Sequence, residues 1–221
     1  MALIITPWKP DLTHRCDGAE LTPTPNVVPM GFKLGARDYA RIGGFVLVAS
    51  THRNGICEMR PQGEQVGFTP IGPPSKTPDQ YHVNGLATDG DVIRYATMCG
   101  LDWRADRTDG RVYDCQTNRP LCTGLNMPHS PRLHRGTLWV CNSERGTVGT
   151  VTDGCYEPFA HFNGFPRGLA FDGHKMFVGV SRLRGGDQPC GIATIDLQTG
   201  AQIDWQTFEQ FREIFVLEIA A

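Results

Sequence analysis

Two histidines and one glutamate occupy matching places in a repeated pattern, and these residue types can transfer protons or bind a metal ion. His82, His129 and Glu213 each lie four residues before an apolar residue that recurs in the repeat. If the repeats surround one axis, the three side chains meet at one height. Together they can hold a divalent metal ion or act as catalytic acid and base. Without a metal, Glu213 is expected to keep one histidine protonated.

A second set of polar side chains lies two residues further along the same segments. These positions hold Arg37, Asn84 and Arg167. Side chains alternate along a strand, so both sets are expected to face the same way. Loops expected at the same end add Trp103 and Arg182, an aromatic face and a cationic donor. The pattern predicts a funnel for a small polar or anionic ligand, although the same residues can instead join neighbouring repeats or lie in ordinary exposed loops.

The elements that position these residues are short strands that recur through the chain. Five segments of about six residues are mostly apolar or β-branched, which is typical of buried strands. Each segment ends in Ser or Thr, and these ends are 38 to 47 residues apart: Thr6, Ser50, Thr97, Ser143 and Ser181. Their hydroxyl groups are expected to satisfy loop amides rather than to do chemistry.

Each recurring strand has antiparallel partners on both sides in the sequence. A strand and a glycine-containing turn precede it, and a second hairpin follows it. Four-stranded sheets at this spacing are typical of β-propeller blades. We therefore predict an all-β protein with a single domain over residues 1–221, a five-bladed β-propeller of four-stranded antiparallel blades. Pairing of residues 217–220 with residues 2–5 would close the ring. The alternative is that the chain belongs to a larger propeller.

Composition and charge exclude several classes of protein. The net charge is −2 and there is no run of basic residues, so nucleic acid is not an expected partner. No segment is long and apolar enough to cross a membrane, and the N-terminus lacks the pattern of a signal peptide. None of the eight cysteines forms a C-x-x-C pair. These features predict a cytoplasmic protein with eight free thiols and no membrane partner.

Several strings in the second half of the chain are distinctive. They include His82-Val83-Asn84-Gly85-Leu86-Ala87, Met127-Pro128-His129-Ser130-Pro131-Arg132, Gly164-Phe165-Pro166-Arg167-Gly168-Leu169 and Glu213-Ile214-Phe215. Over residues 80–220 the sequence resembles DUF4915, a bacterial family of propeller-like proteins without an assigned activity. The resemblance implies the same fold and draws attention to the polar residues in its strings, which add Ser130 and Arg132 to the candidates.

Two kinds of function are compatible with these residues. The first is an enzyme, a lyase, hydrolase or isomerase, that acts through His82, His129 and Glu213, with a divalent metal ion as one option. The second is a lectin-like or protein-binding propeller without catalysis. Titratable groups gathered in one funnel favour the enzyme. Similar pockets in every repeat would favour a lectin, and only two of the five repeats carry a histidine at this position.

Overall fold

The computed structural model describes residues 2–7, 12–17, 20–25, 35–182, 186 and 190–219. Only the backbone is described for the first three of these ranges and for residue 215. Strands are arranged in antiparallel four-stranded sheets. From residue 36 onward, four sheets follow one another along the chain. The first consists of β4 (Ala36–Ile42), β5 (Phe45–Ser50), β6 (Gly55–Met59) and β7 (Gln65–Pro70), and the second of β8 (Val83–Asp89), β9 (Val92–Met98), β10 (Gly110–Asp114) and β11 (Arg119–Leu125). The third consists of β12 (Pro128–His134), β13 (Thr137–Asn142), β14 (Thr147–Thr152) and β15 (Cys155–His161), and the fourth of β16 (Phe165–Asp172), β17 (Lys175–Ser181), β18 (Gly191–Asp196) and β19 (Gln202–Thr207).

The two ends of the chain share one further sheet. Its order is β20 (Ile214–Ile219), β1 (Ala2–Pro7), β2 (Leu12–Asp17) and β3 (Glu20–Pro25). Leu3 pairs with Ile219 and Ile5 pairs with Leu217, so the terminal strands meet in the register expected from the repeat. Residue 220, the last residue of that predicted pairing, lies outside the described residues.

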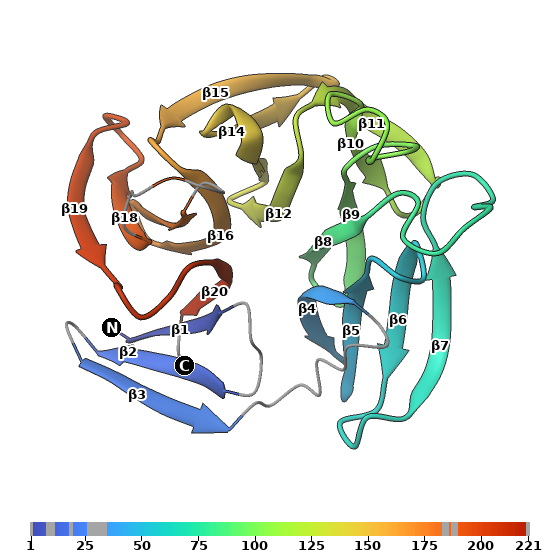
Figure 1. Cartoon of the computed structure of the whole chain (residues 1–221), viewed down its shortest axis with the longest axis horizontal. Coiled ribbons are helices and arrows are strands. Elements are labelled where there is room, and N and C mark those ends of the chain that lie inside the picture. Colours follow the sequence, from blue (N-terminus) through green and yellow to red (C-terminus); the bar gives the residue numbers. More distant parts are fainter. Residues whose placement is uncertain are drawn as a thin grey trace.

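The sheets are arranged around a common centre, with β4, β8, β12, β16 and β20 nearest to it (Figure 1). Each of these inner strands contacts the inner strand of the next sheet, and β20 contacts β4. One short 3-10 helix, η1 (Ser143–Arg145), follows β13. This arrangement brings the N-terminal ends of the inner strands to one end of the molecule, where the candidate residues lie.

The apolar core is divided among the spaces between neighbouring sheets. Because both faces of the middle strands are covered, their sequences are nearly continuous apolar runs rather than alternating ones. Val48, Val140 and Val178 occupy equivalent middle strands and are 0–1% exposed. Burial of such a side chain stabilises the fold by about 1.5–3 kcal/mol.

A β-bulge interrupts the inner strands close to the candidate residues. The pairing register shifts between Ala36 and Asp38 in β4, and equivalent shifts occur in β8, β12 and β16. Gly168 lies in the bulge of β16 with φ +71°. A Cβ atom there would lie 3.1 Å from atoms of Leu217, so glycine suits both the backbone conformation and the close approach of β20. The bulges break the strict alternation of side chains assumed from the sequence.

A buried ion pair connects three inner strands. Asp38 of β4 is 1% exposed and accepts hydrogen bonds from both Nη atoms of Arg132 in β12, at 2.7 and 3.0 Å. It also accepts a hydrogen bond from the backbone N–H of Leu86 in β8. Arg132, predicted as a ligand-binding residue, is therefore occupied within the protein.

The cysteines that the structure describes are free thiols: Cys57, Cys99, Cys115, Cys122, Cys141, Cys155 and Cys190. The side chain of Cys16 lies outside the described part of the chain. Within the described residues, no helix has the length and apolar character needed to span a membrane.

Deleting residues 214–221 is expected to destabilise the protein by several kcal/mol. The deletion removes β20, in which Ile214, Val216 and Leu217 are at most 1% exposed, and it leaves an edge of β1 unpaired. Urea unfolding or thermal melting would measure the loss. A truncated protein that melts at the temperature of the intact chain would contradict the packing role of this strand.

Replacing Asp38 with Ala should reduce the free energy of unfolding by about 3–5 kcal/mol, because it leaves the Arg132 charge without its buried partner. The matched control is Glu64→Gln, which breaks the Arg60–Glu64 pair, whose side chains are 56% and 63% exposed. That change should have an effect of about 1 kcal/mol or less. Equal effects of the two substitutions would show that the buried pair does not hold the strands together.

Candidate functional site

A cavity of about 440 Å³ opens at the N-terminal ends of the inner strands. It is lined by Arg37, Asp79, His82, Trp103, Arg107, Met127, His129, Glu144, Phe165, Arg167, Ser181, Arg182 and Glu213. Seven of the ten residues singled out from the sequence therefore surround one space, including both histidines and Glu213. The size is that of pockets for small organic molecules.

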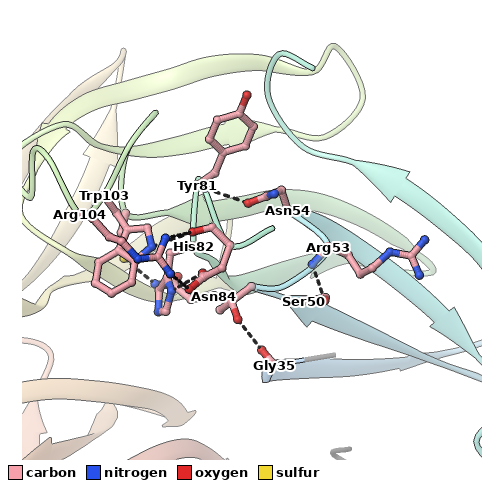
Figure 2. Close-up of polar contacts among 12 residues, drawn as sticks. Gly35, Ser50, Arg53, Asn54, Tyr81, His82, Asn84, Trp103 and Arg104 are labelled. Carbon is pink, nitrogen blue, oxygen red and sulfur yellow. Dashed lines mark hydrogen bonds and ion pairs between the residues drawn. The ribbon is translucent and has the colours of Figure 1, made fainter. Parts of the chain in front are cut away.

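His82 precedes β8 and is held by an aspartate three residues earlier. Its Nδ1 atom lies 2.8 Å from Oδ1 of Asp79. The other carboxylate oxygen of Asp79 accepts a hydrogen bond from Arg104 at 2.8 Å. An ionised carboxylate only accepts hydrogen bonds, so Nδ1 of neutral His82 carries the proton and Nε2 keeps a lone pair. Trp103 and Arg104 lie beside His82 (Figure 2), and the Trp103 and His82 ring centroids are 4.5 Å apart.

His129 in β12 has the same tautomer for a different reason. Its Nδ1 lies 2.8 Å from the Met127 carbonyl oxygen and 2.9 Å from Oγ of Ser143. The Ser143 hydroxyl donates to the Pro166 carbonyl at 2.7 Å, so it accepts from the ring. Nδ1 of His129 is therefore the donor, and no described residue forms a hydrogen bond with Nε2 of either histidine. Each ring thus has one fixed nitrogen and one available acceptor.

Both histidines are kept neutral. Burial lowers the pKa of His82 despite the opposing effect of Asp79. Burial and the positive charge of Arg167 lower the pKa of His129 well below its ordinary value. Because the uncharged imidazole is the form that accepts a proton, both rings can act as bases near neutral pH.

Glu213 precedes β20 and bonds an arginine instead of a histidine. Its Oε2 accepts a hydrogen bond from Nη1 of Arg167 at 3.0 Å. The expectation that Glu213 keeps a histidine protonated is therefore wrong, because the closer cation neutralises the carboxylate and both histidines are buried and uncharged. Burial also lowers the pKa of Arg167 to about 10, and its guanidinium lies over the Phe165 ring.

The three predicted metal ligands do not form a metal centre. Among the described residues, no three His, Cys, Asp or Glu side chains are grouped closely enough to hold a metal ion. The carboxylate is the group that is missing from such a set, because Glu213 bonds Arg167 while both histidines are held through Nδ1 by other partners. A metal ion on His82, His129 and Glu213 is not supported by this geometry.

Three other predicted ligand-binding residues point into the protein. Asn84 is 2% exposed and bonds Thr97 of the neighbouring strand β9 and Cys99 directly after it. Ser130 accepts a hydrogen bond from the Gly168 backbone, and Arg132 bonds Asp38 further along the strands. The bulges break the alternation on which the count relied, but they do not by themselves select a face, because Arg37 and Arg167 hold the position of Asn84 in strands with equivalent bulges and line the cavity.

Three charged residues of the cavity were missed by counting along the repeat: Asp79, Arg107 and Glu144. Asp79 and Arg107 lie in loops and Glu144 lies in η1, so none aligns with an inner strand. Arg107 pairs with Glu144 at 3.3 Å, and Asp79 pairs with His82 and Arg104. The one local signal was the spacing of three residues between Asp79 and His82.

Several cavity residues have strained backbone conformations. Asp79, His82 and Met127 have φ values of +52°, +53° and +52°, which non-glycine residues rarely adopt. Such strain costs on the order of 1–3 kcal/mol per residue and is concentrated at functional sites. Five further described non-glycine residues with positive φ do not line the cavity: Asn54, Asn118, Ser130, Arg135 and Asp153.

A family model for a domain of unknown function, DUF4915, matches residues 38–221. The chain belongs to the DUF4915 family. The match confirms the resemblance and extends it from residues 80–220 to residues 38–221, which adds most of β4 and the rest of its sheet, β5 to β7. No curated protein sequence matches the chain.

Solved structures show the same kind of fold at low sequence identity. Regucalcin from Agrobacterium tumefaciens strain C58, a calcium-binding protein, has 13% identity and a TM-score of 0.59 over 88% of this chain and 66% of its own. A chain of a nidogen–laminin complex has 14% identity and a TM-score of 0.51, and the match covers 98% of this chain and 97% of that one. A chain of hydrazine synthase from Kuenenia stuttgartiensis has 11% identity and a TM-score of 0.54. The match covers 80% of this chain and only 50% of that chain. These matches support an all-β, β-propeller-like fold for this member of DUF4915.

Replacing His129 with Asn should make stability less dependent on pH. The pKa of His129 is lowered in the folded state, so the unfolded chain takes up the proton first as pH falls below about 6.5. Proton uptake then favours unfolding, by up to about 1.4 kcal/mol for each pH unit. Asn retains a donor for the Met127 carbonyl but cannot titrate.

Urea unfolding at pH 7.5 and pH 5 would measure this difference. The free energy of unfolding should fall less in His129→Asn than in the unmodified protein. The control is His161→Asn, which changes an exposed histidine outside the cavity and should leave the pH dependence intact. An unchanged pH dependence in His129→Asn would contradict a neutral buried His129.

Proposed function

We propose that this DUF4915 protein is a closed five-bladed propeller that binds a small anionic ligand in the cavity and converts it by proton transfer. The pairing of β1 with β20 and the succession of inner-strand contacts that returns from β20 to β4 support the closed ring. Such closure leaves no inner strand unpaired at the join.

Binding of an anion is supported by the charges around the cavity. Its lining includes four arginines and three carboxylates, and one of those carboxylates, Asp79, is also paired with Arg104 outside the lining. Arg107 and Arg167 have carboxylate partners, but the described lining residues still carry four positive and three negative charges. A partly enclosed positive site attracts anions and strengthens their interactions relative to water.

The pair of neutral histidines is the observation that carries the enzymatic proposal. Nε2 of His82 and Nε2 of His129 are the basic atoms that the site offers to an occupant. Asp79 holds the ring of His82 in position and would stabilise its imidazolium after proton transfer. Arg37 and Arg167 would stabilise negative charge that develops on the substrate. Lyases, hydrolases and isomerases all use proton abstraction in this way, and Glu213 contributes by positioning Arg167.

A non-enzymatic propeller, lectin-like or protein-binding, is the second candidate. The enclosed space and the asymmetric set of residues favour one small-molecule site over repeated rim pockets. We propose a cytoplasmic location, with neither nucleic acid nor membrane as a partner, and the free thiols of the seven described cysteines are compatible with it.

The proposed function can be tested by incubating the protein with a panel of small organic acids, sugars and sugar phosphates. Proton NMR would follow both binding and conversion. We expect at least one anionic compound to bind and to be converted. His82→Gln and His129→Gln should each slow the conversion by about 10²–10⁴-fold.

The control is His174→Gln, which alters an exposed histidine outside the cavity and should leave the rate unchanged. Binding without conversion of any bound compound would favour the non-enzymatic alternative. Equal rates in the cavity variants and the control would rule out His82 and His129 as the catalytic groups.

A further inference from the structure

The hydrogen-bonding capacity of the cavity limits the chemistry of its ligand. Nδ1 of His82 and Nδ1 of His129 donate to protein acceptors, and each Nε2 makes no hydrogen bond with a described residue. Both imidazoles are neutral because burial lowers the pKa of each. Each Nε2 can therefore only accept a hydrogen bond, so the ligand must provide donors such as hydroxyl groups.

A cationic donor remains available in the same cavity. Arg182 lines the cavity, and its guanidinium group has no ion pair and no hydrogen bond with a described residue. Its Nε atom is buried, so a ligand would bind the group through the Nη atoms. A guanidinium group left in this state is costly unless a ligand accepts its hydrogen bonds. Its planar, forked donors match the two oxygens of a carboxylate.

Two aromatic rings give the cavity apolar faces between these polar groups. The ring centroids of Trp103 and His82 are 4.5 Å apart, and those of Phe165 and His129 are 5.4 Å apart. Such faces accommodate the C–H groups of a short carbon chain or a sugar ring. The volume of about 440 Å³ has room for a ligand of this size.

We propose that the ligand is a hydroxylated carboxylic acid, whose carboxylate binds Arg182 while its hydroxyl groups donate to Nε2 of His82 and Nε2 of His129. The inference rests on the proposed function and specifies its substrate class. A fatty acid would leave both histidine acceptors without donors, and a neutral sugar alcohol would leave Arg182 without an anion. Leaving a buried polar group unsatisfied weakens binding more than a missing surface contact does.

The test compares three six-carbon probes that separate these features. Gluconate has a carboxylate and hydroxyl groups, hexanoate has only the carboxylate, and sorbitol has only the hydroxyl groups. Isothermal titration calorimetry at pH 7.5 should give a dissociation constant for gluconate that is lower by about tenfold or more than for either other probe.

Two substitutions assign the contacts. Arg182→Gln should weaken gluconate binding by about tenfold or more and leave sorbitol binding unchanged, because it removes only the charge that binds the carboxylate. The matched control, Arg60→Gln, alters an exposed arginine outside the cavity and should not affect any probe. Circular dichroism would establish that both variants remain folded.

Each other outcome overturns the inference. Hexanoate binding as tightly as gluconate would mean that the histidines do not recognise hydroxyl groups, and sorbitol binding as tightly would mean that no carboxylate is recognised. Failure of all three probes would overturn the substrate class. The proposed function would survive that failure if the wider panel contained another anion that is bound and converted.

Discussion

The buried Asp38–Arg132 pair constrains the centre of the molecule, and the position of the cavity depends on it. Asp38, Leu86 and Arg132 belong to three different inner strands, and the carboxylate bonds the other two. A charge that is 1% exposed would be unstable alone, so the three strands must keep the arrangement that satisfies it. That requirement fixes the relative heights of β4, β8 and β12, the strands that lead to Arg37, His82 and His129.

Hydroxyl groups join the remaining inner strands in a similar way. Ser143 donates to the Pro166 carbonyl of the next sheet, and Ser181 bonds both the carbonyl and the amide of Ile214. Ser130 accepts from the Gly168 backbone. The serines that end the strands thus satisfy backbone groups between sheets, where an unpaired amide would be costly. Ser143 has a second effect, because the same oxygen fixes the tautomer of His129.

The cavity combines groups that would disturb one another in water. Low exposure keeps the two histidines neutral, and the nearby arginines reinforce that state by opposing a further positive charge. The carboxylates of Asp79 and Glu213 each bind a partner, so they orient His82 and Arg167 rather than neutralise the whole site. The result is a cavity that combines arginines with two unprotonated bases, the combination on which the proposed function rests.

The sequence by itself determined the strand repeat, the inner strands and the shared height of His82, His129 and Glu213. Those features depend on local patterns of apolar residues and turns, which are visible in one chain. The partners of the polar residues depended on packing between sheets: Arg132 bonds Asp38, 94 residues away, and His82 bonds Asp79 from a loop. Asn84 and Ser130 face inward to Thr97 and to the Gly168 amide, and no alternating pattern reveals either partner or the bulges beside them. Only the tertiary structure decided these contacts, because each buried charge or amide takes whichever partner the neighbouring sheet brings within reach.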